Sequence, residues 1–201
     1  MAIMSITVVF SKIKMFSFSY IFLLWGIPII FINLLDVIFL IKSSLKTPKN
    51  VDTRISSIII SLGGAASLLL TSLFLNYPPL HIPGAVHLKA IASLLSLLTY
   101  PLLIWALLCL RSCLTVIPEA HKVVANGIYK YSRHPLYMCY NIWALTYIFI
   151  FQSIPIIIVV FIYYIFVFLR IKREEELLLK TFPEYQDYYD RTGLFGLKFK
   201  K

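Results

Sequence analysis

The stretch PLYMCYNIWALTYIFIFQSIPIIIVVFIYYIFVFL, residues 135–169, contains no charged residue. A helix that crosses the hydrocarbon core of a bilayer needs about 20 apolar residues. The sequence Ser153-Ile154-Pro155 divides the run, because the residue before a proline is disfavoured in the helical conformation. We therefore predict a tight hairpin of two transmembrane helices, 135–153 and 154–172. A single long tilted helix is the alternative.

The composition of the whole chain agrees with a membrane protein. Of its 201 residues, 60% are hydrophobic and 14% are charged, whereas a soluble domain is about half apolar and a quarter charged. The predicted fold is all-α, a polytopic membrane protein with about five transmembrane helices and a cytosolic C-terminal helical extension. Residues 1–201 are predicted to form one domain, in which the other spans are 15–41, 55–76 and 90–110.

The formal net charge of +10 could indicate nucleic acid as a partner. The basic residues lie between the apolar runs rather than on a soluble face, so we predict contacts with membrane lipids and no nucleic acid. They concentrate between the first and second spans, between the third and fourth, and after the fifth. The positive-inside rule then puts the C-terminus in the cytosol, in a bacterial inner membrane or the endoplasmic reticulum.

Two polar segments, 111–134 and 170–195, lie on the same side of the membrane in this layout. A long loop in a compact membrane domain is usually functional. Tyrosine rings attract cations, and the carboxylates of Glu174 and Glu175 accept hydrogen bonds from hydroxyl or amino groups. These segments are predicted to bind a ligand with an aromatic ring and a positive centre. A metal is not predicted, because His121 and His134 have no partner ligand at a standard spacing.

The last apolar run continues into a charged stretch. Leu178, Phe182, Tyr185 and Tyr189 recur at helical spacing, so the fifth helix is expected to continue into the cytosol and pack this face on the protein or the headgroups. Arg170 is expected to extend its side chain to the membrane surface where the span ends.

The motifs of the two polar segments resemble a known family. Gly127-x-Tyr129 followed by Arg133-His134-Pro135-x-Tyr137, and then Glu174-Glu175-x-x-Leu178 with Phe182, Tyr185 and Tyr188, resemble the isoprenylcysteine carboxyl methyltransferase family and the wider phospholipid methyltransferase group. The resemblance extends over about Thr115 to Phe195. It implies a membrane methyltransferase that uses S-adenosyl-L-methionine and methylates a lipidic or prenylated carboxylate acceptor.

The resemblance also implies roles for individual residues. Arg170 and Glu174 match catalytic positions on the substrate side. The positions that match cofactor contacts are His121, Lys122, Val123, Val124, Tyr129, His134, Pro135, Leu136, Tyr137 and Glu175. The chain departs from the family at Cys139, where many members have glycine, and at Leu114, where some have a polar cofactor contact.

Two kinds of methyl acceptor remain open from the residues. A terminal carboxylate has a reference pKa of about 3.3–3.7, so it is ionised and needs no base; Arg170 would orient it through paired hydrogen bonds. An amine, as in a phosphatidylethanolamine-type N-methyltransferase, would need Glu174 or a histidine to remove a proton. A sterol-type reductase and a non-catalytic membrane protein are the remaining alternatives.

Asp36 lies inside the first predicted span, three residues after Asn33. Ionisable residues within a membrane are functional candidates. Asp36 is only six residues before Lys42, roughly 9 Å along a helix, so we expect a structural role near the interface.

Overall fold

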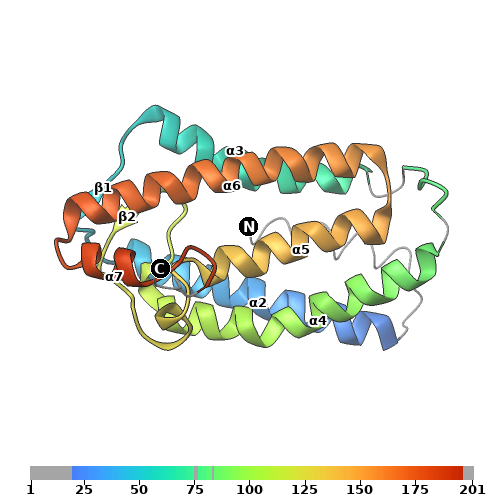
Figure 1. The fold of residues 1–201 in the computed structure, drawn as a ribbon, viewed down its shortest axis with the longest axis horizontal. Helices are drawn as coiled ribbons and strands as arrows, with labels where there is room; N and C mark the ends of the chain where they lie inside the picture. The colour runs from blue at the N-terminus through green and yellow to red at the C-terminus, as the bar shows by residue number, and fades with distance from the viewer. Residues whose placement is uncertain (1–19, 75–76, 83, 197–201) are drawn as a thin grey trace.

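The computed structural model of the chain describes residues 20–74, 77–82 and 84–196, and within this part the protein is mostly helical. Figure 1 shows a bundle of long helices, with α3 and α6 side by side and α2 and α4 on the other side of α5. The helices are α2 (Tyr20–Ser44), α3 (Ile55–Thr71), α4 (Ala85–Leu110), α5 (Pro135–Phe151), α6 (Ile154–Thr181) and α7 (Tyr185–Arg191). Short 3-10 helices are η1 (Ser72–Phe74), η2 (Arg111–Cys113) and η3 (Gly127–Lys130).

The predicted helical hairpin is present, whereas the crossing of a membrane by both of its helices stays a prediction. The chain leaves α5 at Gln152, which has a left-handed backbone with a φ of 51°, and passes through the extended Ser153 into α6. Pro155 lies in the first turn of α6, where its missing N–H costs no hydrogen bond. The break rules out one long helix over the uncharged run.

The helix after the hairpin continues past the apolar run, as predicted, and ends at Thr181. Phe182 is extended, with φ −125° and ψ 105°, because Pro183 follows it. The chain then turns into the separate short helix α7, so the apolar face predicted from Leu178 to Tyr189 is divided between two helices. Buried Leu177, Phe182, Tyr185 and Tyr188 form one cluster with Ala120.

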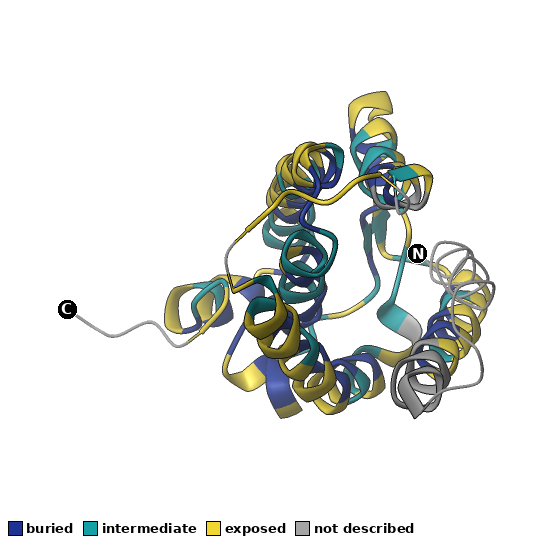
Figure 2. Cartoon of the chain, turned by 90° about the vertical axis from the view of Figure 1, so that its right-hand side faces the viewer, coloured by how far each residue is buried: buried dark blue, intermediate teal, exposed yellow. Residues whose placement is uncertain are grey.

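Outward faces of the bundle carry large apolar side chains. Leu94, Leu98, Phe161 and Phe168 are each more than half exposed, and Figure 2 shows exposed residues on the outside of the helices and buried ones towards the inside. Such faces suit contact with lipid. Among the residues that the structure describes, two helices, α4 and α6, are long and apolar enough to cross a membrane, whereas the apolar parts of α3 and α5 are shorter. Five spans stay a prediction, and residues 15–19 and 75–76 of the predicted spans lie outside the described residues.

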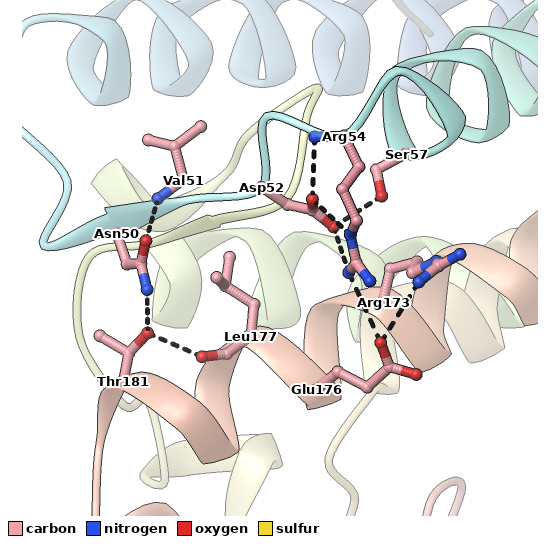
Figure 3. Close-up of polar contacts among 9 residues, drawn as sticks. All are labelled: Asn50, Val51, Asp52, Arg54, Ser57, Arg173, Glu176, Leu177 and Thr181. Atoms are coloured by element: carbon pink, nitrogen blue, oxygen red, sulfur yellow. Dashed lines mark hydrogen bonds and ion pairs between the residues drawn. The ribbon is translucent and has the colours of Figure 1, made fainter.

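The connection between α2 and α3 is fastened across one end of the bundle. Its strand β1 (Asn50–Val51) pairs antiparallel with β2 (Glu119–Ala120) of the loop after α4. Figure 3 shows Asn50 donating to Thr181 of α6 and Arg54 reaching Glu176. The loop after α4 and the end of α6 are thereby held in one layer with this connection.

Asp52 is the polar centre of the same connection. Its buried carboxylate accepts hydrogen bonds from Arg54, at 2.6 and 2.8 Å, and from Ser57 Oγ at 2.6 Å. The hydrogen bonds from Arg54 hold the pKa of Asp52 well below its usual range, although burial opposes the shift. Asp52 therefore stabilises the start of α3 only while it is ionised.

We predict that Asp52→Asn lowers the thermal unfolding midpoint in detergent at pH 7. A carboxyl with a lowered pKa contributes its full stability above the unfolded pKa, about 3.9, and loses it as the pH falls through the folded value. The difference between wild type and variant should be constant from about pH 5 to 8 and shrink below about pH 4. Asp187→Asn, which changes an exposed carboxylate, is the control; an equal effect of both variants would contradict this account.

Gly127 begins η3 at a point where the loop packs closely against α4. Its φ is +57°, and a Cβ there would overlap Cys109 Sγ. Gly127→Ala should cost about 1–2 kcal/mol for the left-handed backbone and a further 1–3 kcal/mol or so for the overlap. Adding Cys109→Ala to this variant should restore only the stability that is lost through the overlap. Gly84→Ala is the matched control, since Gly84 also has a positive φ, +74°, but open space around it; thermal unfolding should show a smaller loss there.

Candidate functional site

Arg133 is buried where the loop after α4 meets α6 and α7. Its Nε donates to Glu175 Oε1 at 2.6 Å, and its Nη1 donates to the carbonyls of Tyr189, at 2.9 Å, and Thr192. The guanidinium also lies 4.0 Å from the centroid of the Tyr189 ring. A single side chain thus joins the loop, the end of α6 and the segment after α7.

His134 precedes α5 and shares the carboxylate of Glu175. Its Nε2 lies 3.1 Å from Glu175 Oε1, and its backbone N–H donates to Leu194 O. Burial alone would raise the pKa of Glu175, but the hydrogen bonds with His134 and Arg133 lower it below the ordinary value. Glu175 is therefore an ionised anchor that orients His134 towards the interior.

Tyr129 is held in place by α7. The hydroxyl of Tyr188 donates to Tyr129 O at 2.6 Å. Burial raises the pKa of Tyr188 to about 12, so this phenol stays a neutral donor at physiological pH. The contact fixes η3 against the apolar cluster of α6 and α7.

Two adjoining cavities lie beside these residues. The first, the membrane cavity, encloses about 790 Å³ including its open mouth, and is lined by Asp36, Leu40, Ser61, Ala65, Leu110, Cys113, Leu114, Thr115, Val116, Tyr129, Arg133, His134, Leu136, Tyr137, Tyr140, Arg170 and Glu174. The second, the loop cavity, encloses about 470 Å³ and is lined by Leu110, Cys113, Glu119, His121, Lys122, Val123, Val124, Tyr129, Arg133, His134, Glu174, Leu178, Tyr185 and Tyr188. The two spaces meet at the six residues that line both, which are Leu110, Cys113, Tyr129, Arg133, His134 and Glu174.

Arg170 faces the membrane cavity. Its Nη2 donates to Thr115 O at 2.6 Å, and its guanidinium lies 5.7 Å from the centroid of the Tyr137 ring. Its contact with Thr115 O ties it to the loop after α4; that the side chain reaches the membrane surface stays a prediction. Its buried Nε has no hydrogen-bond partner within the described part of the chain, so one charged donor is available to a ligand.

Glu174 lies one turn after Arg170 on the same face of α6. Tyr137 donates to Glu174 Oε2 at 2.8 Å. The carboxylate is thus directed to the junction of the two cavities, and it retains lone pairs for another donor.

The structure brings most of the predicted site residues together. Those at the loop cavity are His121, Lys122, Val123, Val124, Tyr129, His134 and Glu174, and those at the membrane cavity include Leu136, Tyr137 and Arg170. Pro135 and Glu175 line neither; Pro135 begins α5, and Glu175 lies behind His134. In the described ranges, no group of three potential metal ligands occurs.

His121 has a structural contact that its motif did not predict. Its Nε2 lies 3.0 Å from Glu119 Oε2 and 3.2 Å from Ser43 Oγ at the end of α2. The ring therefore joins the loop to α2 as well as lining the loop cavity.

Several cavity residues were not predicted from the sequence. Arg133 belongs to the motif quoted above. Its position next to His134 in the sequence could have indicated that it lines the site. Asp36, Ser61 and Tyr140 lie in apolar helices, where hydropathy does not indicate which face turns inward.

Comparisons with known proteins agree with this geometry. Residues 90–180, from α4 to the end of α6, match the model of the isoprenylcysteine carboxyl methyltransferase (ICMT) family. The predicted family resemblance is confirmed over this segment. A protein-S-isoprenylcysteine O-methyltransferase of Saccharomyces cerevisiae is 33% identical over 81 residues, 39% of this chain and 34% of that relative. One of Dictyostelium discoideum is 37% identical over 73 residues, 35% of this chain and 30% of its own length.

The matched parts span about a third of the length of each of these relatives. The segment that matches the family model contains most of α4, the loop with His121, Tyr129 and His134, and α5 and almost all of α6 with Tyr137 and Arg170. It does not contain α2 or α3, which also line the membrane cavity.

We predict that Glu175→Gln destabilises the protein by about 3–5 kcal/mol, because removing one partner of a buried ion pair leaves the other charge uncompensated. Glu176→Gln is the matched control: the neighbouring carboxylate is exposed, its ion pairs with Arg54 and Arg173 are each 3.5 Å long, and its loss should cost about 0–1 kcal/mol. Unfolding in detergent measures both. Equal costs would show that Arg133 does not depend on Glu175.

Proposed function

We propose that this protein is an S-adenosyl-L-methionine-dependent methyltransferase that methylates the carboxylate of a lipidic or prenylated acceptor in the membrane. The observation that carries the proposal is the junction of the two cavities at Tyr129, His134 and Glu174. One cavity lies among long apolar helices and the other among polar loops. A lipid acceptor and a water-soluble cofactor can therefore meet there, and the names of the relatives support this reaction.

The loop cavity suits the cofactor by its chemistry, since its lining combines aromatic rings, histidines and a carboxylate. When bound, S-adenosyl-L-methionine supplies a methyl group on a positively charged sulfur. The ring of Tyr129 and the carboxylate of Glu174 favour such a cation at the junction. Glu175 lines neither cavity and contributes indirectly, by orienting His134.

Arg170 supports a carboxylate as the acceptor group. Arg170 lines the membrane cavity, and its buried Nε has no hydrogen-bond partner within the described part of the chain; a carboxylate bound beside the guanidinium would accept a strong charge-assisted hydrogen bond. Thr115 O and the Tyr137 ring hold the guanidinium in place. The Arg170 side chain therefore loses little conformational entropy when the acceptor binds.

The transfer needs no proton. A carboxylate oxygen forms a bond to the methyl carbon as the bond between that carbon and the sulfur breaks. The bonding electrons go to the sulfur, which becomes neutral, and the carboxylate becomes a neutral ester. Positioning the two reactants in line can supply roughly 7–11 kcal/mol of the barrier, and this is the main task of the residues at the junction.

The membrane arrangement belongs to the same proposal. The helices α2 to α6 would cross the bilayer, with the β1–β2 end and α7 in the cytosol. The basic residues at this end, such as Lys42, Lys46 and Lys122, follow the positive-inside rule. The acceptor then arrives through lipid and the cofactor through water.

We predict that the purified protein binds S-adenosylhomocysteine in calorimetry and transfers labelled methyl to an S-prenylated cysteine carboxylate. Arg170→Gln should lower kcat/KM for this acceptor by roughly 10-fold to 100-fold, since a hydrogen bond to a charged group contributes about 1.5–3 kcal/mol, with little change in S-adenosylhomocysteine affinity. Arg173→Gln, which changes an arginine outside both cavities, should leave both measurements near wild type.

Two results would contradict the proposal. Methyl transfer to phosphatidylethanolamine but to no carboxylate acceptor would favour the N-methyltransferase. Binding of a nicotinamide cofactor without S-adenosylhomocysteine binding would favour the reductase.

A further inference from the structure

The buried serines of α3 differ in what their hydroxyl groups contact. Ser57 Oγ donates to Asp52 Oδ2 at 2.6 Å. Ser67 Oγ donates to Gly64 O within the helix at 2.9 Å. Ser61, which is 1% exposed, has a buried Oγ with no hydrogen-bond partner within the described ranges. A buried hydroxyl without a hydrogen bond destabilises a fold, so packing alone does not account for a serine at this position.

Of the two cavities described above, Ser61 lines the membrane cavity only. Ala65, one turn further along α3, lines the same cavity, so this face of the helix borders it. A serine side chain has a single torsion angle between its backbone and its oxygen, and rotation about it is enough to direct the hydroxyl to a bound ligand. In the proposed function, the ligand of the membrane cavity is the acceptor.

Two contacts give the register of α3 against α6. Directly before α3, Arg54 Nη2 lies 3.5 Å from Glu176 Oε2. Further along α3, a Cβ added to Gly63 would lie 2.6 Å from Cε1 of Phe166. The start of α3 therefore lies beside the end of α6, and the two helices run antiparallel, as Figure 1 shows. Ser61 lies between these two contacts.

This register brings Ser61 close to the level of Arg170. Ser61 is two residues before Gly63, and Arg170 is four residues after Phe166 on the antiparallel helix. At a rise of 1.5 Å per residue, the two backbone positions differ by about 3 Å along the bundle. Arg170 also lines the membrane cavity, and its Nε likewise has no partner in the described part of the chain. Two unpaired groups on facing helices thus border one cavity at nearly one level.

Resting on the proposed function, we propose that Ser61 binds the acceptor carboxylate together with Arg170. An ionised carboxylate has two oxygens with about four acceptor positions, and the Nε–H of Arg170 fills one of them. The hydroxyl of Ser61 supplies a second donor from the facing helix. The assignment adds to the acceptor site a residue of α3, which lies outside the segment that matches the ICMT family model.

The two donors have different roles in the transfer. One carboxylate oxygen forms the bond to the methyl carbon as the carbon–sulfur bond breaks, and the negative charge is lost. The other oxygen becomes the carbonyl oxygen of the ester, which still accepts hydrogen bonds. Ser61 binds this second oxygen, so its contact is present before and after transfer. An interaction that is equally strong in the bound substrate and in the transition state changes KM and leaves kcat unchanged.

The test measures methyl transfer and thermal unfolding of Ser61→Ala in detergent. With N-acetyl-S-farnesylcysteine as acceptor, KM should rise roughly 10-fold, the effect of one hydrogen bond to a charged group, and kcat should stay near the wild-type value. The affinity for S-adenosylhomocysteine in calorimetry should not change. The unfolding midpoint without ligands should equal or exceed that of wild type, because the variant removes an unpaired buried hydroxyl.

A second acceptor and a control variant locate the contact. S-farnesyl-3-mercaptopropionate keeps the carboxylate and lacks the amide, so Ser61→Ala should raise its KM by the same factor. Ser67→Ala removes a buried hydroxyl from the same helix, and Ser67 lines neither cavity. This control should leave KM and kcat at their wild-type values with both acceptors.

The outcomes separate this inference from the proposed function. An unchanged KM in Ser61→Ala overturns the inference and leaves carboxylate methylation standing. A rise in KM that is confined to the acetylated acceptor assigns Ser61 to the amide and also overturns it. A lower unfolding midpoint, or a variant that does not fold, assigns the hydroxyl to packing and overturns it as well. Methylation of neither acceptor by wild type contradicts the proposed function itself.

Discussion

The ion pair between Arg133 and Glu175 is the contact on which the site depends. Burying two charges costs several kcal/mol per ion unless each is well paired, and here the remaining hydrogen-bonding capacity is used. Arg133 also donates to carbonyls of Tyr189 and Thr192, and Glu175 also contacts His134. The pair therefore fixes three segments of the chain at one point, and the loop residues that line both cavities lie next to it.

The same pairing explains how irregular backbone is tolerated beside a membrane. Carbonyl groups after α7 have no helical partners and need donors. Ser132 Oγ and the backbone N–H groups of Arg133 and His134 donate to Gly193 and Leu194. The segment after α7 is thus folded back over the start of α5, and its polar groups are satisfied within the protein as a low-dielectric environment requires.

The sequence was sufficient for those features that depend on local chemistry. Hydropathy located the helices, and Pro155 predicted the break between α5 and α6. The break before Pro183 was not predicted, and it divides the expected apolar face between α6 and α7. The family resemblance implied roles for Tyr129, His134 and Glu174, and the structure places all three in the lining of both cavities. Contacts between distant segments were not predictable in this way. The pairing of Asn50 with Ala120, and the contact of Arg170 with Thr115 O, depend on how the helices pack, and apolar helices carry no periodic signal for their inner face.

The charge change in the proposed reaction also gives the site a means of releasing its product. In this proposal, Arg170 would face an anion and Glu174 a cation before transfer. After transfer both ligands would be neutral at those positions, so both attractions would be lost together. Arg170 keeps Thr115 O, and Glu174 keeps the Tyr137 hydroxyl, so neither residue must rearrange. An ester is also more soluble in lipid than its parent carboxylate, because it has lost a charge that is costly to bury. The proposed site at the edge of the bilayer would therefore release the ester product into lipid.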